Sequence, residues 1–97
     1  MVKHIILWKL KTENNTPEVK KGIKEGLEAL LGQIDGLLEI KVHTNGLVSS
    51  NADVMLYSVF ESEEALKAYA VHPKHVEVAD TKVRPFTAER SCLDFVE

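Results

Sequence analysis

The residues best suited to chemistry lie together in the segment from Tyr69 to His75, which carries one phenol and two imidazoles. Imidazole titrates near neutrality, with an ordinary pKa of about 6.5, so His75 is the candidate for taking up and returning a proton. Tyr69 could donate a hydrogen bond to a carbonyl or enolate oxygen and stabilise developing negative charge. The alternative is that Tyr69 is an ordinary core aromatic residue and that His75 stands at a helix start for structural reasons.

His72 precedes a proline, which disfavours the helical conformation of the residue before it. We therefore expect a helix to end at Pro73 and His72 to bond a carbonyl freed at that end. His72 and His75 also have the H-x-x-H spacing that can grip a metal on a helix, with Glu77 or Asp80 as a third ligand. The intervening proline argues against such a site. We expect neither a built-in metal nor a cofactor.

Further candidates lie near the two ends of the chain. His4 shares a strand face with Ile6 and Trp8, so it is either part of a pocket wall or a buried histidine with a hydrogen-bond partner. Asp94 could orient a histidine or pair with a lysine. The single cysteine, Cys92, cannot form an internal disulfide, and we expect it to act as a small buried hydrophobic residue.

The elements that must position these residues follow from the hydrophobic periodicity. Alternation predicts strands over residues 2–11, 38–43, 54–60 and 89–96. Apolar residues at spacings of three and four predict a helix from Pro17 to about Ile34, a second helix from Ser62 to Pro73, and a short helical piece to about Asp80. This order is that of a ferredoxin-like βαββαβ fold of the α+β class, in which a four-stranded antiparallel sheet carries its helices on one face.

Gly22 and Gly26 lie inside the first predicted helix. Each weakens a helix by up to about 1 kcal/mol relative to alanine, which indicates that the helix backbone approaches something closely there. The sheet or a ligand could fill that space.

Apolar residues occupy both faces of the first and third strands, which are the central pair of this fold. Two helices can cover only one face, so the other would expose roughly five large side chains, each worth about 1.5–3 kcal/mol when fully buried. Monomers rarely expose so large an apolar patch. We therefore predict a homodimer joined through the sheet.

The composition limits the class of protein. The chain is 97 residues long, 44% hydrophobic and 28% charged, with a formal net charge of −3. These values suit a single domain over residues 2–96 and give no basic face for nucleic acid. The sequence contains no long apolar run and no leader-like start, so we expect no membrane partner and a cytoplasmic location.

Four segments together resemble the stress-responsive dimeric α/β-barrel (Dabb) family. They are residues 2–11, Phe60-Glu61-Ser62, the Y-x-x-H-P-x-H motif from Tyr69 to His75, and Leu93-Asp94-Phe95. The resemblance implies ferredoxin-like protomers that pair through their sheets into a barrel. The family includes stress-associated plant proteins and a plant polyketide cyclase, olivetolic acid cyclase.

The resemblance to the cyclase also implies roles for single residues. The tyrosine and final histidine of its motif, which match Tyr69 and His75, are its proposed acid/base pair, and His4 matches a pocket histidine. This chain departs from the cyclase at two positions, since it has Val54 and Leu27 where the cyclase has a histidine and a tyrosine.

We therefore expect a homodimer that binds a small aromatic or polyketide-like molecule in a mostly apolar pocket between the sheet and its helices. Cyclase-like acid/base chemistry without a cofactor would use His75 and Tyr69. The expected ligand-binding residues are His4, Ile6, Trp8, Ile23, Leu27 and His72. Two alternatives remain: a non-catalytic stress-associated module for dimerisation or assembly, and a cofactor-free monooxygenase.

Overall fold

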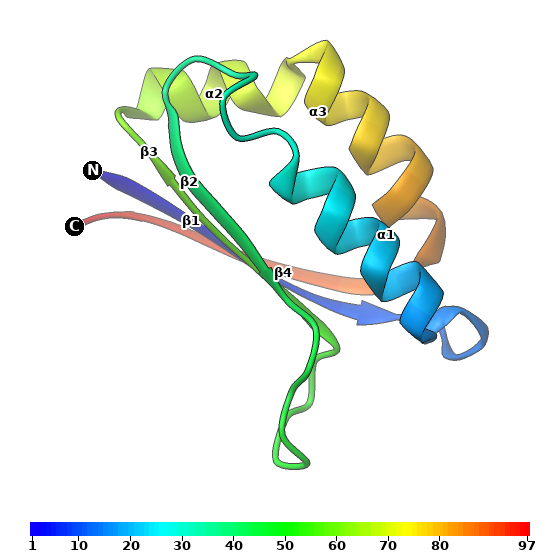
Figure 1. Ribbon diagram of the computed structural model, residues 1–97. Coiled ribbons are helices and arrows are strands. Elements are labelled where there is room, and N and C mark those ends of the chain that lie inside the picture. The colour runs from blue at the N-terminus through cyan, green and yellow to red at the C-terminus, as the bar shows by residue number, and fades with distance from the viewer.

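The predicted order of strands and helices is confirmed in the computed structural model, which describes residues 1–97. The strands β1 (Val2–Leu10), β2 (Leu37–His43), β3 (Val54–Phe60) and β4 (Thr87–Val96) form one antiparallel sheet in the order β2-β3-β1-β4. The helices α1 (Pro17–Glu28), α2 (Glu63–Val71) and α3 (Pro73–Val78) cover one face of the sheet (Figure 1). None of these helices has the length and apolar character needed to cross a membrane.

The two longer helices begin where the sequence predicts. The Thr16 hydroxyl accepts a hydrogen bond from the Val19 amide at 3.2 Å, and Pro17 occupies the first turn of α1. The Ser62 hydroxyl accepts one from the Ala65 amide at 3.1 Å at the start of α2. These caps fix the points at which the chain leaves the sheet.

The end of α1 differs from the prediction, because the helix stops at Glu28 rather than near Ile34. The next residues form tight turns, with the Leu30 amide bonded to the Leu27 carbonyl at 3.1 Å, and Gly32 has a positive φ of 85° that a helix cannot contain. Leu30 and Ile34 are nevertheless buried. The helical spacing of apolar residues therefore continues through a turn that still faces the core.

The close approach predicted at the α1 glycines occurs, but the neighbour is another helix. A Cβ on Gly26 would lie 3.0 Å from Val78 Cγ1 of α3, whereas one on Gly22 would lie 3.8 Å from the Lys82 side chain. Neither the sheet nor a ligand fills this space, contrary to our expectation. Gly26 thus lets α1 pack directly against α3.

The β2 strand has a register irregularity at its start. Leu38 alternates with Ile40 and Val42 in the sequence, so we expect it on their face of the strand. The pairing with β3 shifts between Leu37 and Glu39, however, so Leu37 is buried and Leu38 is exposed. Ile40 and Val42 face the core as predicted.

The face of the sheet opposite the helices is apolar over its centre and one edge. Leu7, Leu93 and Phe95 are exposed there, and Ile5 is partly buried between them. Val59 also belongs to this face by its position in β3, but it is only 7% exposed. It lies opposite Lys3 and Glu39 in the neighbouring strands, whose long aliphatic stems can shield it.

Candidate functional site

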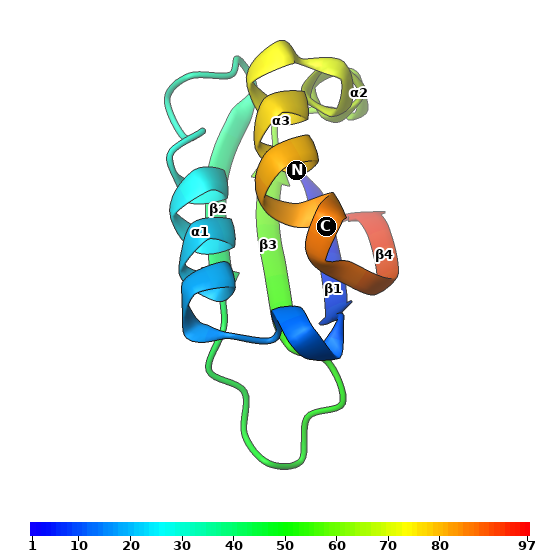
Figure 2. The same ribbon diagram turned by 90° about the vertical axis from the view of Figure 1, so that its right-hand side faces the viewer.

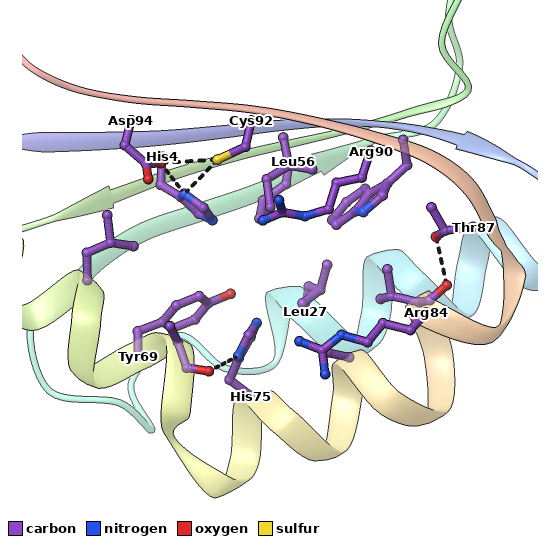
Figure 3. A pocket seen from close by; sticks show the side chains of 16 residues that line it. His4, Leu27, Leu56, Tyr69, His75, Arg84, Thr87, Arg90, Cys92 and Asp94 are labelled. Carbon is purple, nitrogen blue, oxygen red and sulfur yellow. Dashed lines mark hydrogen bonds and ion pairs between the residues drawn. The ribbon is translucent and has the colours of Figure 1, made fainter.

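A cavity of about 550 Å³ lies between the sheet and the α2–α3 side of the helical layer (Figure 3). This volume is within the range of about 300–1,000 Å³ that is usual for small-molecule sites. Most of its lining residues are hydrophobic. The cavity opens toward β4, because three of the four β4 residues that line it, Arg90, Cys92 and Asp94, are exposed to solvent.

Six of the eight residues that we expected in the site line this cavity: His4, Ile6, Trp8, Leu27, Tyr69 and His75. Ile23 does not, because it faces the packed core and is 0% exposed. His72 does not either. Its Nδ1 accepts a hydrogen bond from the Lys74 amide at 3.1 Å and so caps the start of α3. We expected His72 to bond a carbonyl freed at the end of α2, and this prediction is wrong. The backbone N–H groups in the first turn of α3 have no partner within the helix, and His72 accepts a hydrogen bond from one of them.

Tyr69 reaches the cavity from the inner face of α2. Its ring packs edge-on against Phe60, with ring centroids 4.9 Å apart, and the residue is 1% exposed. The phenol hydroxyl is buried and has no hydrogen-bond partner. Burial raises the pKa of Tyr69, so the hydroxyl keeps its proton at neutral pH. The Tyr69 hydroxyl is therefore a buried hydrogen-bond donor that is free to bond a ligand in the cavity.

His75 lies beside Tyr69, with 4.2 Å between the ring centroids. Because a carbonyl can only accept, the contact of 3.3 Å between His75 Nδ1 and the Ala70 oxygen makes Nδ1 the donor. Nε2 then carries the free lone pair, and Figure 3 shows this nitrogen on the cavity side of the ring. Burial lowers the pKa of His75, the Ala70 bond opposes this shift, and the positive charge of Arg84 adds to the lowering. His75 is therefore a neutral base at neutral pH.

His4, Cys92 and Asp94 form a polar cluster on the sheet side of the cavity (Figure 3). His4 and Asp94 are directly opposite each other in the β1–β4 pairing, and His4 Nδ1 donates to Asp94 Oδ1. Cys92 Sγ lies 3.8 Å from His4 Nδ1 and 3.5 Å from Asp94 Oδ1. Burial, followed by the Asp94 charge, raises the pKa of Cys92. His4 is thus both part of the wall and hydrogen-bonded, and Asp94 orients a histidine rather than pairing with a lysine.

Sequence reasoning missed the role of β4 as a wall of the site. We expected Cys92 to be buried, but it is exposed, because no helix covers the edge strand on which it lies. Two cationic wall residues, Arg84 and Arg90, were also not anticipated. Arg84 is paired with Asp80, whereas Arg90 makes no ion pair. The alternation of Arg90, Cys92 and Asp94 on one strand face was the available signal.

The H-x-x-H spacing does not bring the two motif histidines together. The Nδ1 atoms of His72 and His75 are bonded to the Lys74 amide and the Ala70 carbonyl respectively. His72 lies between α2 and α3, whereas His75 lies within α3, so the two rings do not share one helix face.

Comparisons with known proteins agree with this fold. Residues 2–97 match the model of the stress responsive A/B barrel domain, and the chain belongs to that family (Dabb). Over 98 aligned residues the chain is 31% identical to a stress-response A/B barrel domain-containing protein of Arabidopsis thaliana. The match covers 99% of this chain and 36% of that protein, so the chain spans about a third of the relative's length.

Solved structures show the same architecture. A dimeric protein of unknown function with a ferredoxin-like fold from Bacteroides fragilis is 33% identical, with a TM-score of 0.87 and coverage of 97% of this chain and 93% of that one. A hydroxynitrile lyase from Passiflora edulis is 17% identical, with a TM-score of 0.81 and coverage of 97% and 90%. At this low identity the lyase shows only that the fold is shared.

Proposed function

We propose that the chain forms a homodimer through the open face of its sheet. The apolar patch around Leu7, Leu93 and Phe95 supports this, and so does the dimeric state of the relative from Bacteroides fragilis. The charged double variant Leu7→Glu/Phe95→Glu should be monomeric or unfolded at concentrations at which the wild type is dimeric, as measured by light scattering. Val48→Glu, in a fully exposed loop, is the matched control and should remain dimeric. A stable dimer of the double variant would contradict this interface.

We propose further that the cavity binds a small, mostly apolar molecule with a carbonyl or phenolic oxygen, and that the chain carries out acid/base chemistry on it. The observation that carries this proposal is the buried, unpartnered hydroxyl of Tyr69 beside the neutral His75. A buried donor without a partner costs about 1–3 kcal/mol, which a ligand oxygen at that point would recover. Such a donor is also well placed to stabilise an oxyanion as it forms.

In this reaction His75 Nε2 removes a proton from the carbon next to the carbonyl. Tyr69 donates its hydrogen bond to the carbonyl oxygen as negative charge develops there, and the proton on His75 is then returned to the product. Arg90, which has no carboxylate partner, adds positive charge at the open end of the cavity. Enolisation and aldol-type ring closure both fit these roles.

The test uses phenylacetone, an aromatic ketone with exchangeable α-hydrogens, and follows their replacement by deuterium with NMR. The wild type should accelerate the exchange over buffer. Tyr69→Phe should lower the acceleration by about 10²–10³-fold and His75→Ala by about 10²–10⁴-fold. Tyr69→Phe should leave the fold intact, because it removes only the unpartnered hydroxyl. His43→Ala, an exposed position on β2, is the control.

Exchange in His75→Ala at the wild-type rate would remove this residue from the mechanism. If both variants bind and exchange as the wild type does while the dimer persists, the non-catalytic assembly module is the better description.

A further inference from the structure

We propose that His4, Cys92 and Asp94 form a binding site for one zinc ion, at the wall of the cavity and separate from the Tyr69–His75 pair. His4 would bind through Nδ1, Cys92 through its thiolate, and Asp94 through a carboxylate oxygen. These three ligand atoms all lie within 4.8 Å of one another. Nitrogen, sulfur and carboxylate oxygen from three residues are a ligand set that Zn²⁺ accepts.

The separations between the ligand atoms fit a tetrahedral ion. Zinc bonds of about 2.3 Å to sulfur and about 2.0–2.2 Å to nitrogen and oxygen put tetrahedral ligand pairs that include sulfur about 3.5–3.7 Å apart. The Cys92–His4 and Cys92–Asp94 separations are 3.8 Å and 3.5 Å. His4 and Asp94 are closer because they share a hydrogen bond. On binding, the Nδ1 proton of His4 would move to Nε2, which keeps the imidazole neutral, and the ion would take its place at Nδ1.

The strands hold the three residues in place before any metal binds. Cys92 and Asp94 are two positions apart on one face of β4, and His4 lies opposite Asp94 on the paired strand β1. Ligands on paired strands lose little freedom on binding, unlike ligands on loops. The charges also balance, since one thiolate and one carboxylate neutralise the ion.

The same geometry argues against a nucleophilic cysteine. In a catalytic Cys-His-Asp arrangement the thiol and the carboxylate contact opposite nitrogens of the imidazole. Here both approach Nδ1 of His4, so the imidazole cannot pass a proton between them. The three ligand atoms, His4 Nδ1, Cys92 Sγ and an Asp94 carboxylate oxygen, instead surround one point, as the ligands of a single ion do.

Three protein ligands leave the fourth position of a tetrahedral zinc ion open. All three residues line the cavity, so this position would face a bound molecule or water (Figure 3). The site would then take an oxygen of the ligand or a water molecule. Binding would release the thiol proton of Cys92.

The test is titration of the reduced, metal-stripped protein with Zn²⁺ by calorimetry, and with Co²⁺ by absorption spectroscopy. The wild type should bind one zinc ion per chain, and the cobalt form should show a thiolate charge-transfer band with strong tetrahedral bands. Because even residues outside the ligand set change metal affinity by about 10–100-fold, Cys92→Ser and Asp94→Asn should weaken zinc binding by about 100-fold or more.

Both of these positions are exposed, so the variants should fold, which circular dichroism would verify. His43→Ala and His72→Ala should bind zinc as the wild type does. Absence of zinc binding, a cobalt spectrum without the thiolate band, or unchanged affinity in Cys92→Ser would overturn the proposal. Deuterium exchange plays no part in this test, so its outcome is independent of the acid/base proposal.

Discussion

The helix-covered face of the sheet has a packed half and a hollow half. At the β2 edge, α1 contacts the sheet, and Ile23 and Val42 are 0% and 1% exposed. At the other edge β4 packs mainly against β1, and none of its residues is buried. Figure 2 shows α1 beside β2 and β4 at the opposite side of the sheet. The helical layer is therefore too narrow for the sheet, and the uncovered edge becomes the mouth of the cavity.

The packed half of this face mainly stabilises the fold, whereas the hollow half carries the candidate site. The packed half buries apolar side chains, which stabilises the fold. The hollow half holds the polar residues of the cavity wall, including Tyr69, whose buried hydroxyl has no hydrogen-bond partner. The same substitution should therefore have different effects in the two halves.

The largest expected effect is the loss of a packed side chain. Ile23→Ala should lower the free energy of unfolding by about 2–5 kcal/mol, because it leaves a void in the core. Leu66→Ala, on the cavity wall, should cost about 1 kcal/mol, because that side chain is only partly buried. Urea denaturation at one fixed protein concentration measures both. Equal losses would show that the cavity wall is packed like the core.

A smaller effect is expected where α1 meets the next helix. Gly22→Ala should stabilise the fold by up to about 1 kcal/mol, because the new methyl group meets only ordinary contacts and alanine favours a helix. Gly26→Ala should gain nothing or lose about 1 kcal/mol, because its methyl group would press against Val78. Thermal unfolding of the pair measures the difference. A gain at both positions would mean that α3 can move away from α1.

The smallest expected effect concerns the titration of His75. Its pKa is lowered in the folded protein, so the unfolded chain binds a proton first as the pH falls. The contribution of this group to stability is therefore present above pH 6.5 and is lost as the pH falls below that value. The basic form, which the proposed reaction requires, persists below pH 6.5 for the same reason.

Arg84→Gln tests the cause of this shift. It should raise the pKa of His75, because it removes a neighbouring positive charge. The rise should be small, because solvent screens the charge of an exposed side chain. An NMR titration of the imidazole measures the change, with Arg90→Gln as the comparison. Arg84 lowers the pKa of His75 more than Arg90 does, so a larger change in the Arg90 variant would contradict this explanation of the shift.

Much of the cavity could be predicted because strands alternate. His4, Ile6 and Trp8 had to share a face wherever β1 lay in the sheet. The helix starts at Thr16 and Ser62 could be predicted because a hydroxyl side chain at this position caps the first turn of a helix. Ile23 was misplaced because helical spacing identifies an inward face without saying whether core or cavity lies beneath it. Cys92 was misplaced because alternation does not reveal which strand is an uncovered edge.

The sequence by itself determined the order of elements, the inward and outward faces of β1 and β3 and the apolar character of both sides of this central pair, because each depends on residues close together in the chain. Only the tertiary structure decided that His4 meets Asp94, which is 90 positions away, and that the Tyr69 hydroxyl is left unpartnered next to His75. Those features depend on how far the helices extend across the sheet. That extent is set by packing between distant segments, such as the contact of Gly26 with Val78, and no local pattern specifies it.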